Sequence, residues 1–167
     1  MRTLIVIALV AAVGCGKSKP IPGEAGIFAS KIDEFASRYD DGKNEIQKSQ
    51  VFNEAREFEK TFFSSRNNRL AYWQGKLGSI RTTEGGKGLA VMIYVGRVRF
   101  WSGDSIIERR MIQPSDPVYQ QVAKLQEGDC VNFVGEVVPK EKSATESGAM
   151  RNPEYDAILT SVDKCPN

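Results

Sequence analysis

The chain contains no histidine. This absence excludes Ser-His and Cys-His nucleophile pairs, histidine general bases and histidine metal ligands, because each of them needs an imidazole. Cysteine is scarce as well, with only Cys15, Cys130 and Cys165. Three cysteines without a C-x-x-C pair cannot supply a structural Cys₄ zinc site. The composition therefore argues against most nucleophilic enzymes, and we expect no metal and no cofactor.

Net charge is also small, because 23 basic and 21 acidic side chains leave a formal charge of +2 at pH 7. Proteins that bind nucleic acid strongly are usually far more basic, so the charge argues against nucleic acid as a partner. Apolar residues make up 41% and charged residues 26% of the 167 positions, a balance that predicts one globular domain with a core.

The first apolar run covers residues 4–13 and follows Arg2. It is too short for a transmembrane helix, which needs about 20 apolar residues. A basic start, a short apolar run and small residues after it predict a secretory signal peptide over residues 1–14. The segment Ala12-Val-Gly-Cys15 resembles the lipobox of bacterial lipoproteins. The resemblance implies cleavage before Cys15, a lipid on its sulfur and a cell-envelope location, on the periplasmic face of the outer membrane in a two-membrane bacterium.

Residues 11–18 of the same region fit a relaxed phosphate-loop pattern, which would predict a nucleotide site. Such a loop needs a helix that begins at Lys17-Ser18 and points its N–H groups at the phosphate. Pro20 and Pro22 stand where that helix would run. We therefore expect residues 15–25 to form an exposed tether and not a nucleotide site.

Residues 26–66 have a helical period and predict a hairpin of two helices. Asp40-Asp41-Gly42 breaks the pattern, and Asn44 can cap the second helix. Charged residues, including Arg56, Glu57 and Lys60, are assigned to its solvated outer face. Apolar side chains form one stripe on each helix. The stripe of the first helix is Phe28, Ile32, Phe35 and Tyr39, and that of the second is Ile46, Val51, Phe52, Ala55, Phe58, Phe62 and Phe63. The second stripe is rich in aromatic residues and is expected to pack on a sheet.

Residues 70–167 predict a β-rich domain with one inserted helix. Its expected strands cover residues 72–81, 89–95, 97–101, 130–138 and 155–162. The helix is expected to start near Pro117, and residues 140–152 are expected to be a polar loop. Three strands, a helix and two strands is the order of the OB-fold, a five-stranded Greek-key barrel. The predicted fold class is therefore α+β, a helical hairpin followed by an OB-fold barrel.

Three segments carry a more specific resemblance. Leu125–Glu136 resembles the L-x-x-G-D-x-V-x-F-x-G fourth strand of bacterial OB-fold domains, and Trp73-Gln-Gly75 resembles their W-x-G first strand. Thr145–Tyr155 is similar to a segment of bacterial OB-fold proteins of uncharacterised function. The resemblance implies an OB-fold lipoprotein, akin to a group named for its likeness to tRNA-anticodon-binding domains. These motifs concern the fold and imply neither RNA binding nor catalysis.

Cys130 and Cys165 lie at the start of the fourth expected strand and the end of the fifth. These segments can lie close together in a Greek-key barrel, and export would place both cysteines in an oxidising compartment, which favours a disulfide. Two buried free thiols are the alternative. Catalytic thiol chemistry is not expected, because no histidine can activate a thiol.

A possible ligand-binding face lies on the second and third expected strands, where Arg97, Arg99 and Trp101 alternate and Tyr94 stands nearby. These strands often carry ligand contacts in OB-folds, and arginines beside an aromatic ring suit a single-stranded nucleic acid. The simpler interpretation is an exposed strand with solvated arginines. The near-neutral charge and the predicted export favour this simpler interpretation.

The carboxylates show no recognised spacing for acid/base catalysis or for a metal: Asp104, Glu108, Asp116, Asp129, Glu146, Glu154 and Asp156. We therefore predict no catalytic residues and a non-enzymatic, lipid-anchored binding module that recognises an envelope protein or peptide. A single-stranded nucleic-acid-binding protein is the alternative function, followed by a carboxylate-dependent hydrolase.

Overall fold

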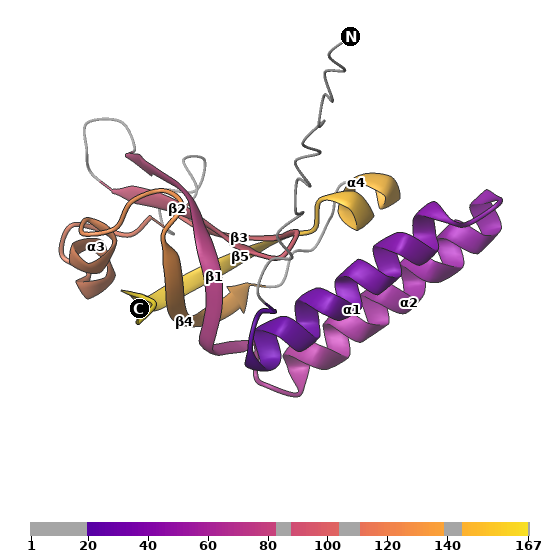
Figure 1. Cartoon of the computed structure of the whole chain (residues 1–167), viewed down its shortest axis with the longest axis horizontal. Coiled ribbons are helices and arrows are strands. Elements are labelled where there is room, and N and C mark those ends of the chain that lie inside the picture. Colours follow the sequence, from indigo (N-terminus) through magenta and orange to yellow (C-terminus); the bar gives the residue numbers. More distant parts are fainter. Residues whose placement is uncertain (1–19, 83–87, 104–110, 139–144, 167) are drawn as a thin grey trace, which may run out of the picture.

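The computed structural model describes residues 20–82, 88–103, 111–138 and 145–166. The predicted signal peptide and Cys15 lie outside the described residues. No helix in the described ranges is both long enough and apolar enough to cross a membrane. The elements in chain order are α1 (Gly23–Asp40), α2 (Glu45–Ser64), β1 (Arg69–Thr82), β2 (Leu89–Val95), β3 (Val98–Ser102), α3 (Pro117–Val122), β4 (Cys130–Val138), α4 (Glu146–Arg151) and β5 (Glu154–Lys164) (Figure 1).

The strands close into a barrel in the order β1-β2-β3-β5-β4. β3 and β5 run parallel, and the other neighbouring pairs run antiparallel. Helix α3 comes between β3 and β4 in the chain and packs against β5. This strand order and this helix position are those of the OB-fold, so the predicted fold class is confirmed.

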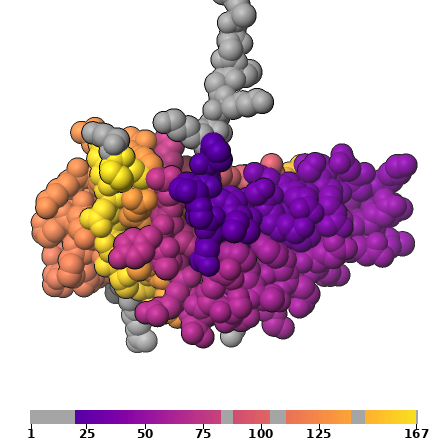
Figure 2. All heavy atoms as spheres, turned by 60° about the horizontal axis from the view of Figure 1, so that its bottom comes forward, coloured from indigo at the N-terminus to yellow at the C-terminus, as the bar shows by residue number. Residues whose placement is uncertain are grey.

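Helices α1 and α2 form the predicted hairpin, which projects beyond the barrel (Figure 2). Asn44 caps α2, because its Oδ1 accepts a hydrogen bond from the Gln47 backbone N–H at 2.9 Å. Helix α1 begins at Gly23, inside the predicted tether, directly after Pro22 at the N-cap. Ile46 departs from the predicted stripe and is 72% exposed, because it lies in the first turn of α2, at the end of the hairpin far from the barrel.

The loop prediction for residues 140–152 was wrong, because α4 occupies part of that segment. Thr145 caps α4 by accepting a hydrogen bond from the Gly148 N–H at 3.3 Å. Met150 is buried in a small cluster on the hairpin with Phe35, Tyr39, Val51 and Ala55. A helix this short with a single buried side chain has no readable apolar period, and packing against α1 and α2 stabilises it instead.

Phe28 joins the hairpin to the barrel. Its side chain is fully buried, and its ring centroid lies 4.9 Å from those of Phe62 and Phe63 and 5.5 Å from that of Trp73. Trp73 reaches the barrel interior from β1, where its ring centroid lies 5.5 Å from that of Phe100. One core therefore runs from the hairpin into the barrel, and its aromatic contacts add to the effect of burial.

Cys130 and Cys165 form a disulfide, with their Cα atoms 5.3 Å apart, so this prediction is confirmed. The Cys165 N–H also donates to the Cys130 carbonyl at 2.9 Å. Cys130 is exposed and Cys165 is half-buried. The alternative prediction, two buried free thiols, therefore does not describe these residues. An ion pair of 2.7 Å between Lys164 and Asp129 lies beside the disulfide and lowers the pKa of Asp129.

Replacing Phe28 with alanine should lower the free energy of unfolding by about 3–5 kcal/mol, because the change leaves a cavity where hairpin and barrel meet. Ile27→Ala is the matched control on the same helix, since Ile27 is 65% exposed and its loss should cost at most about 0.5 kcal/mol. Urea unfolding followed by tryptophan fluorescence measures both values. Similar losses for the two variants would contradict the central position of Phe28.

Removing the disulfide with the double variant Cys130→Ser and Cys165→Ser should also destabilise the fold. The bond joins residues 35 positions apart. The chain-entropy treatment gives about 4 kcal/mol for a loop of that size. Urea unfolding of the exported protein and of the double variant measures the difference, and non-reducing mass spectrometry checks the linkage. Two free thiols in the exported protein would contradict the disulfide.

Candidate functional site

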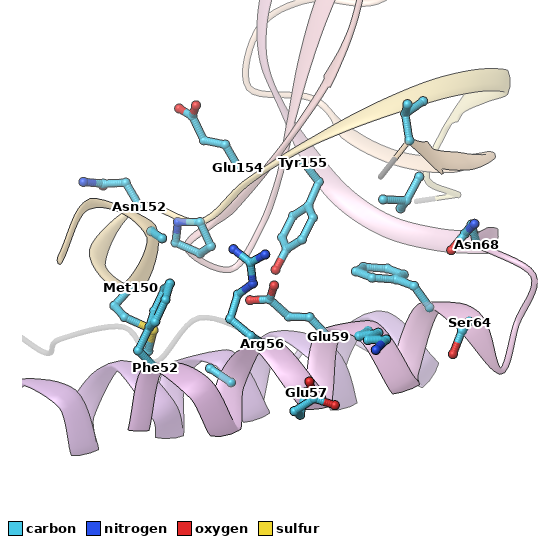
Figure 3. Close-up of a pocket in the computed structure, with 17 residues that line it drawn as sticks. Phe52, Arg56, Glu57, Glu59, Ser64, Asn68, Met150, Asn152, Glu154 and Tyr155 are labelled. Atoms are coloured by element: carbon cyan, nitrogen blue, oxygen red, sulfur yellow. The ribbon is translucent and has the colours of Figure 1, made fainter. Parts of the chain in front are cut away.

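A cleft lies between α2, α4 and the end of the barrel where β4 finishes and β5 begins (Figure 3). Its volume of about 710 Å³ falls within the range of roughly 300–1,000 Å³ that is typical of ligand sites. About half of the lining residues are apolar and the others are polar or charged: Phe52, Ala55, Arg56, Glu57, Glu59, Lys60, Phe63, Ser64, Asn68, Val137, Val138, Ala149, Met150, Asn152, Pro153, Glu154 and Tyr155.

Helix α2 supplies one wall of the cleft. Phe52, Arg56, Glu59 and Phe63 recur at spacings of four and three residues, which places them on one face of the helix. Arg56, Glu57 and Lys60 are exposed, as predicted for a solvated face, and all three also line the cleft. The spacing to Phe52 and Phe63 is the sequence signal that could have placed Arg56 and Glu59 on the inward face.

Three polar side chains meet in the centre of the cleft. Figure 3 shows the Tyr155 hydroxyl directed at the Glu59 carboxylate, with the Arg56 guanidinium beside both. The Tyr155 oxygen is inaccessible to solvent, and its contact falls short of full hydrogen-bond geometry. It is nevertheless close enough for Glu59 and Tyr155 to shift each other's pKa. None of the three was a predicted site residue. Tyr155 was expected only as a strand residue, and Arg56 only as part of a solvated helix face.

Burial decides the protonation behaviour of this group. It raises the pKa of the Glu59 carboxyl above its ordinary value, and the Tyr155 hydroxyl and the Arg56 charge oppose that rise. Burial also raises the pKa of Tyr155 well above its ordinary value, and the neighbouring Glu59 charge acts in the same direction. Tyr155 therefore keeps its proton and remains a hydrogen-bond donor.

The other charged residues of the lining lie toward its edges. Glu57 points to the side of α2 away from Tyr155, and Glu154 points away from the Glu59 carboxylate (Figure 3). Glu154 is paired with Arg99 at 2.7 Å. Lys60 is exposed. The charges at the centre of the cleft are therefore one cation, Arg56, and one titratable carboxyl, Glu59.

The structure separates the residues of the predicted ligand-binding face. Arg97 lies in the turn between β2 and β3, where its Nε is 2.6 Å from Asp33 of α1. Arg99 lies opposite Tyr94 in the β2–β3 register and pairs with Glu154. Both predicted arginines therefore already face a carboxylate.

The two aromatic residues of that face are half-buried on β2 and β3. Tyr94 packs across Gly78 of β1, where the absence of a side chain leaves room for its ring. Trp101 has the Arg81 guanidinium 5.9 Å from its ring centroid. These contacts place both rings within the outer surface of the sheet.

The carboxylates do not assemble into a candidate metal centre in the described part of the chain. No group of three or more cysteine, aspartate or glutamate side chains comes together there. Asp116 instead accepts a hydrogen bond from the Gln113 N–H at 2.7 Å, and Glu146 accepts one from Ser49 at 3.1 Å. Asp104 and Glu108 lie outside the described residues.

Comparison with known proteins identifies no relative, since no protein-family model, no curated protein and no solved structure matches the chain. The OB-fold assignment therefore rests on the strand order and on the position of α3. The similarity to OB-fold lipoproteins stays a prediction from sequence motifs.

Glu59→Gln should change how stability depends on pH. Folding raises the pKa of Glu59 above its ordinary value of 4.5. At pH values between 4.5 and the folded pKa, the folded protein therefore binds more protons than the unfolded chain does. The wild type should therefore lose stability relative to Glu59→Gln as the pH rises through the interval between 4.5 and the folded pKa. Urea unfolding from pH 4 to pH 8 measures this trend.

The matched control is Glu57→Gln, which removes a carboxylate from the opposite side of the same helix. It corrects for the loss of one negative charge from α2. A difference between wild type and Glu59→Gln that stays constant over the whole pH range would contradict a raised pKa at Glu59.

Proposed function

We propose that this chain is a lipid-anchored binding module of the cell envelope, and that its cleft holds a segment of another envelope protein. The observation that carries this proposal is the cleft between α2, α4 and the barrel. Its apolar side chains favour contact with apolar parts of a ligand, and the polar and charged side chains among them provide orientation and specificity.

The cell-envelope location is supported by two independent features. Residues 1–14 have the pattern of a signal peptide, and Cys15 follows in a lipobox-like context. Cys130 and Cys165 form a disulfide, whereas a reducing cytosol would keep both as free thiols. Both features fit a chain that is exported and held at a membrane by a lipid on Cys15.

Binding is better supported than the hydrolase alternative. A carboxylate-dependent hydrolase needs two carboxyl groups that face one substrate bond from suitable positions. In the cleft, Glu57 and Glu154 both point away from Glu59 (Figure 3). A binding role needs only the apolar walls and the polar centre that the cleft offers.

Binding of single-stranded nucleic acid has less support than binding of a protein segment. That alternative needs basic side chains that can neutralise phosphates along a continuous surface. Arg97 and Arg99 instead pair with Asp33 and Glu154. An oligonucleotide would have to displace both carboxylates.

The function is tested in the native bacterium with a photocrosslinking amino acid placed at one position of the full chain. Asn152, exposed on the cleft, is the test position, and Ile46, 72% exposed on the hairpin, is the control. Position 152 should give a discrete adduct with an envelope protein, and position 46 should not. The absence of any adduct from position 152, or the same adducts from both positions, would contradict the proposal.

A second arm of this experiment uses Cys15→Ser with the crosslinker at position 152. Without a thiol to carry the lipid, the protein should leave the membrane fraction, and the yield of the adduct should fall. Continued fractionation of Cys15→Ser with membranes would contradict a lipid anchor at this residue.

A further inference from the structure

We infer that the surface around Ile27, near the start of α1, rests on the lipid membrane and fixes the orientation of the anchored domain. This inference rests on the lipid anchor of the proposed function and makes the membrane surface a second partner of the folded domain. Figure 2 shows the start of α1, in indigo, on the surface of the molecule beside the barrel. Ile27 does not line the cleft, so a contact through Ile27 does not itself fill the cleft.

The reach of the tether limits how far this surface can lie from the bilayer. Ile21 is half-buried and packs against the core, so the chain is attached to the folded domain from this residue onward. A fully extended chain covers about 3.3–3.6 Å per residue, so the proposed lipid-bearing Cys15 lies within about 20 Å of Ile21. The tether also carries Lys17 and Lys19, whose charges favour anionic lipid headgroups. An anchored domain therefore stays at the membrane surface.

Ile27 lies close to the point where the tether joins the domain. A helix rises about 1.5 Å per residue, so Ile27 is about 6 Å along α1 from Gly23. The same rise places the far end of this helix of 18 residues about 27 Å from its start. Ile46 lies at that far end, in the first turn of α2 (Figure 1). The tether therefore brings position 27, and not position 46, to the bilayer.

The surface at the start of α1 offers apolar groups to lipid. Ile27 is 65% exposed, and Pro20 and Pro22, which lead into α1, are exposed as well. An exposed isoleucine gains free energy when its apolar area leaves water. Because the anchor already holds the domain beside the bilayer, this gain does not have to offset the cost of bringing two free molecules together. A contact too weak to bind a free domain to a membrane can therefore orient an anchored one.

The residues around Ile27 present no unpaired charge to the bilayer. Its neighbours on the helix surface, at spacings of three and four residues, are Gly23, Glu24, Ser30 and Lys31. Both charged neighbours are in ion pairs, Glu24 with Arg66 at 3.0 Å and Lys31 with Glu34 at 2.7 Å. A paired charge loses less than an isolated one when water is displaced from its surroundings. Contact with lipid at Ile27 therefore leaves no isolated charge at the interface.

A photocrosslinking amino acid at position 27 tests the inference, and position 46 is the matched control because Ile46 is also an exposed isoleucine. The lipidated protein is reconstituted in vesicles of three parts phosphatidylethanolamine to one part phosphatidylglycerol. Mass spectrometry measures the lipid adducts and verifies the lipid on Cys15. Position 27 should give about tenfold more lipid adduct than position 46, as expected for burial of one isoleucine side chain.

A second comparison separates contact through Ile27 from proximity to the membrane. The crosslinker is placed at position 30, because Ser30 is exposed and lies one helical turn from Ile27. Ile27→Asp should lower the lipid adduct at position 30 by about fivefold or more, because the apolar contact is lost and a carboxylate resists dehydration. Ile27→Leu, which keeps the apolar area, and Ile46→Asp, which adds the same charge at the far end of the hairpin, should leave the yield unchanged.

Equal lipid adducts from positions 27 and 46, or a yield at position 30 that Ile27→Asp does not lower, would overturn the inference. A protein adduct in place of a lipid adduct from position 27 in the native membrane would also overturn it, because a protein would then cover this surface. Each of these results leaves the proposed function intact when Cys15 carries its lipid and position 152 gives its envelope adduct. The absence of a lipid on Cys15 would overturn the proposed anchor together with the inference.

Discussion

The buried ring of Phe28 is the contact on which the arrangement of this molecule depends. It touches Phe62 of α2, Trp73 of β1 and Tyr155 of β5, so one side chain is shared by the hairpin and by two strands of the barrel. Interiors are packed closely, so such a shared core fixes the direction of the hairpin relative to the barrel. The cleft exists because α2 is held beside the ends of β4 and β5 in this way.

Helix α4 completes the cleft through a second and smaller core. Met150 carries most of its attachment, since the contacts that accompany it are exposed or part-buried: Ser49 with Glu146 at 3.1 Å and Arg151 with Asp40 at 3.3 Å. Exposed ion pairs contribute little to stability, whereas a buried methionine side chain contributes on the order of 2 kcal/mol. The wall formed by α4 is therefore tied to the hairpin, whose own position depends on the core at Phe28.

Glu59 is the residue that packing alone does not explain. Burial disfavours its charged form, and a leucine at this point of the α2 face would extend the apolar surface without that cost. Sequences usually agree with their fold at every level, and disagreements of this kind concentrate at functional sites. The Tyr155 hydroxyl and the Arg56 guanidinium both reduce that cost, because each of them favours the charged form of the carboxyl group.

The sequence by itself determined the helical hairpin, the cap at Asn44 and the strands β2 and β4 with their observed bounds, because apolar period and turn residues are local signals. It also predicted the pairing of Cys130 with Cys165, because the two strand ends that carry them can lie close together in a Greek-key barrel. It did not reveal α4, whose single buried residue leaves no period. Only the tertiary structure decided where the cleft lies and that both predicted arginines of the third strand are paired with carboxylates. The cleft draws on residues 52–68, 137–138 and 149–155, and segments so far apart in the chain meet only when barrel closure and the packing of Phe28 bring them together.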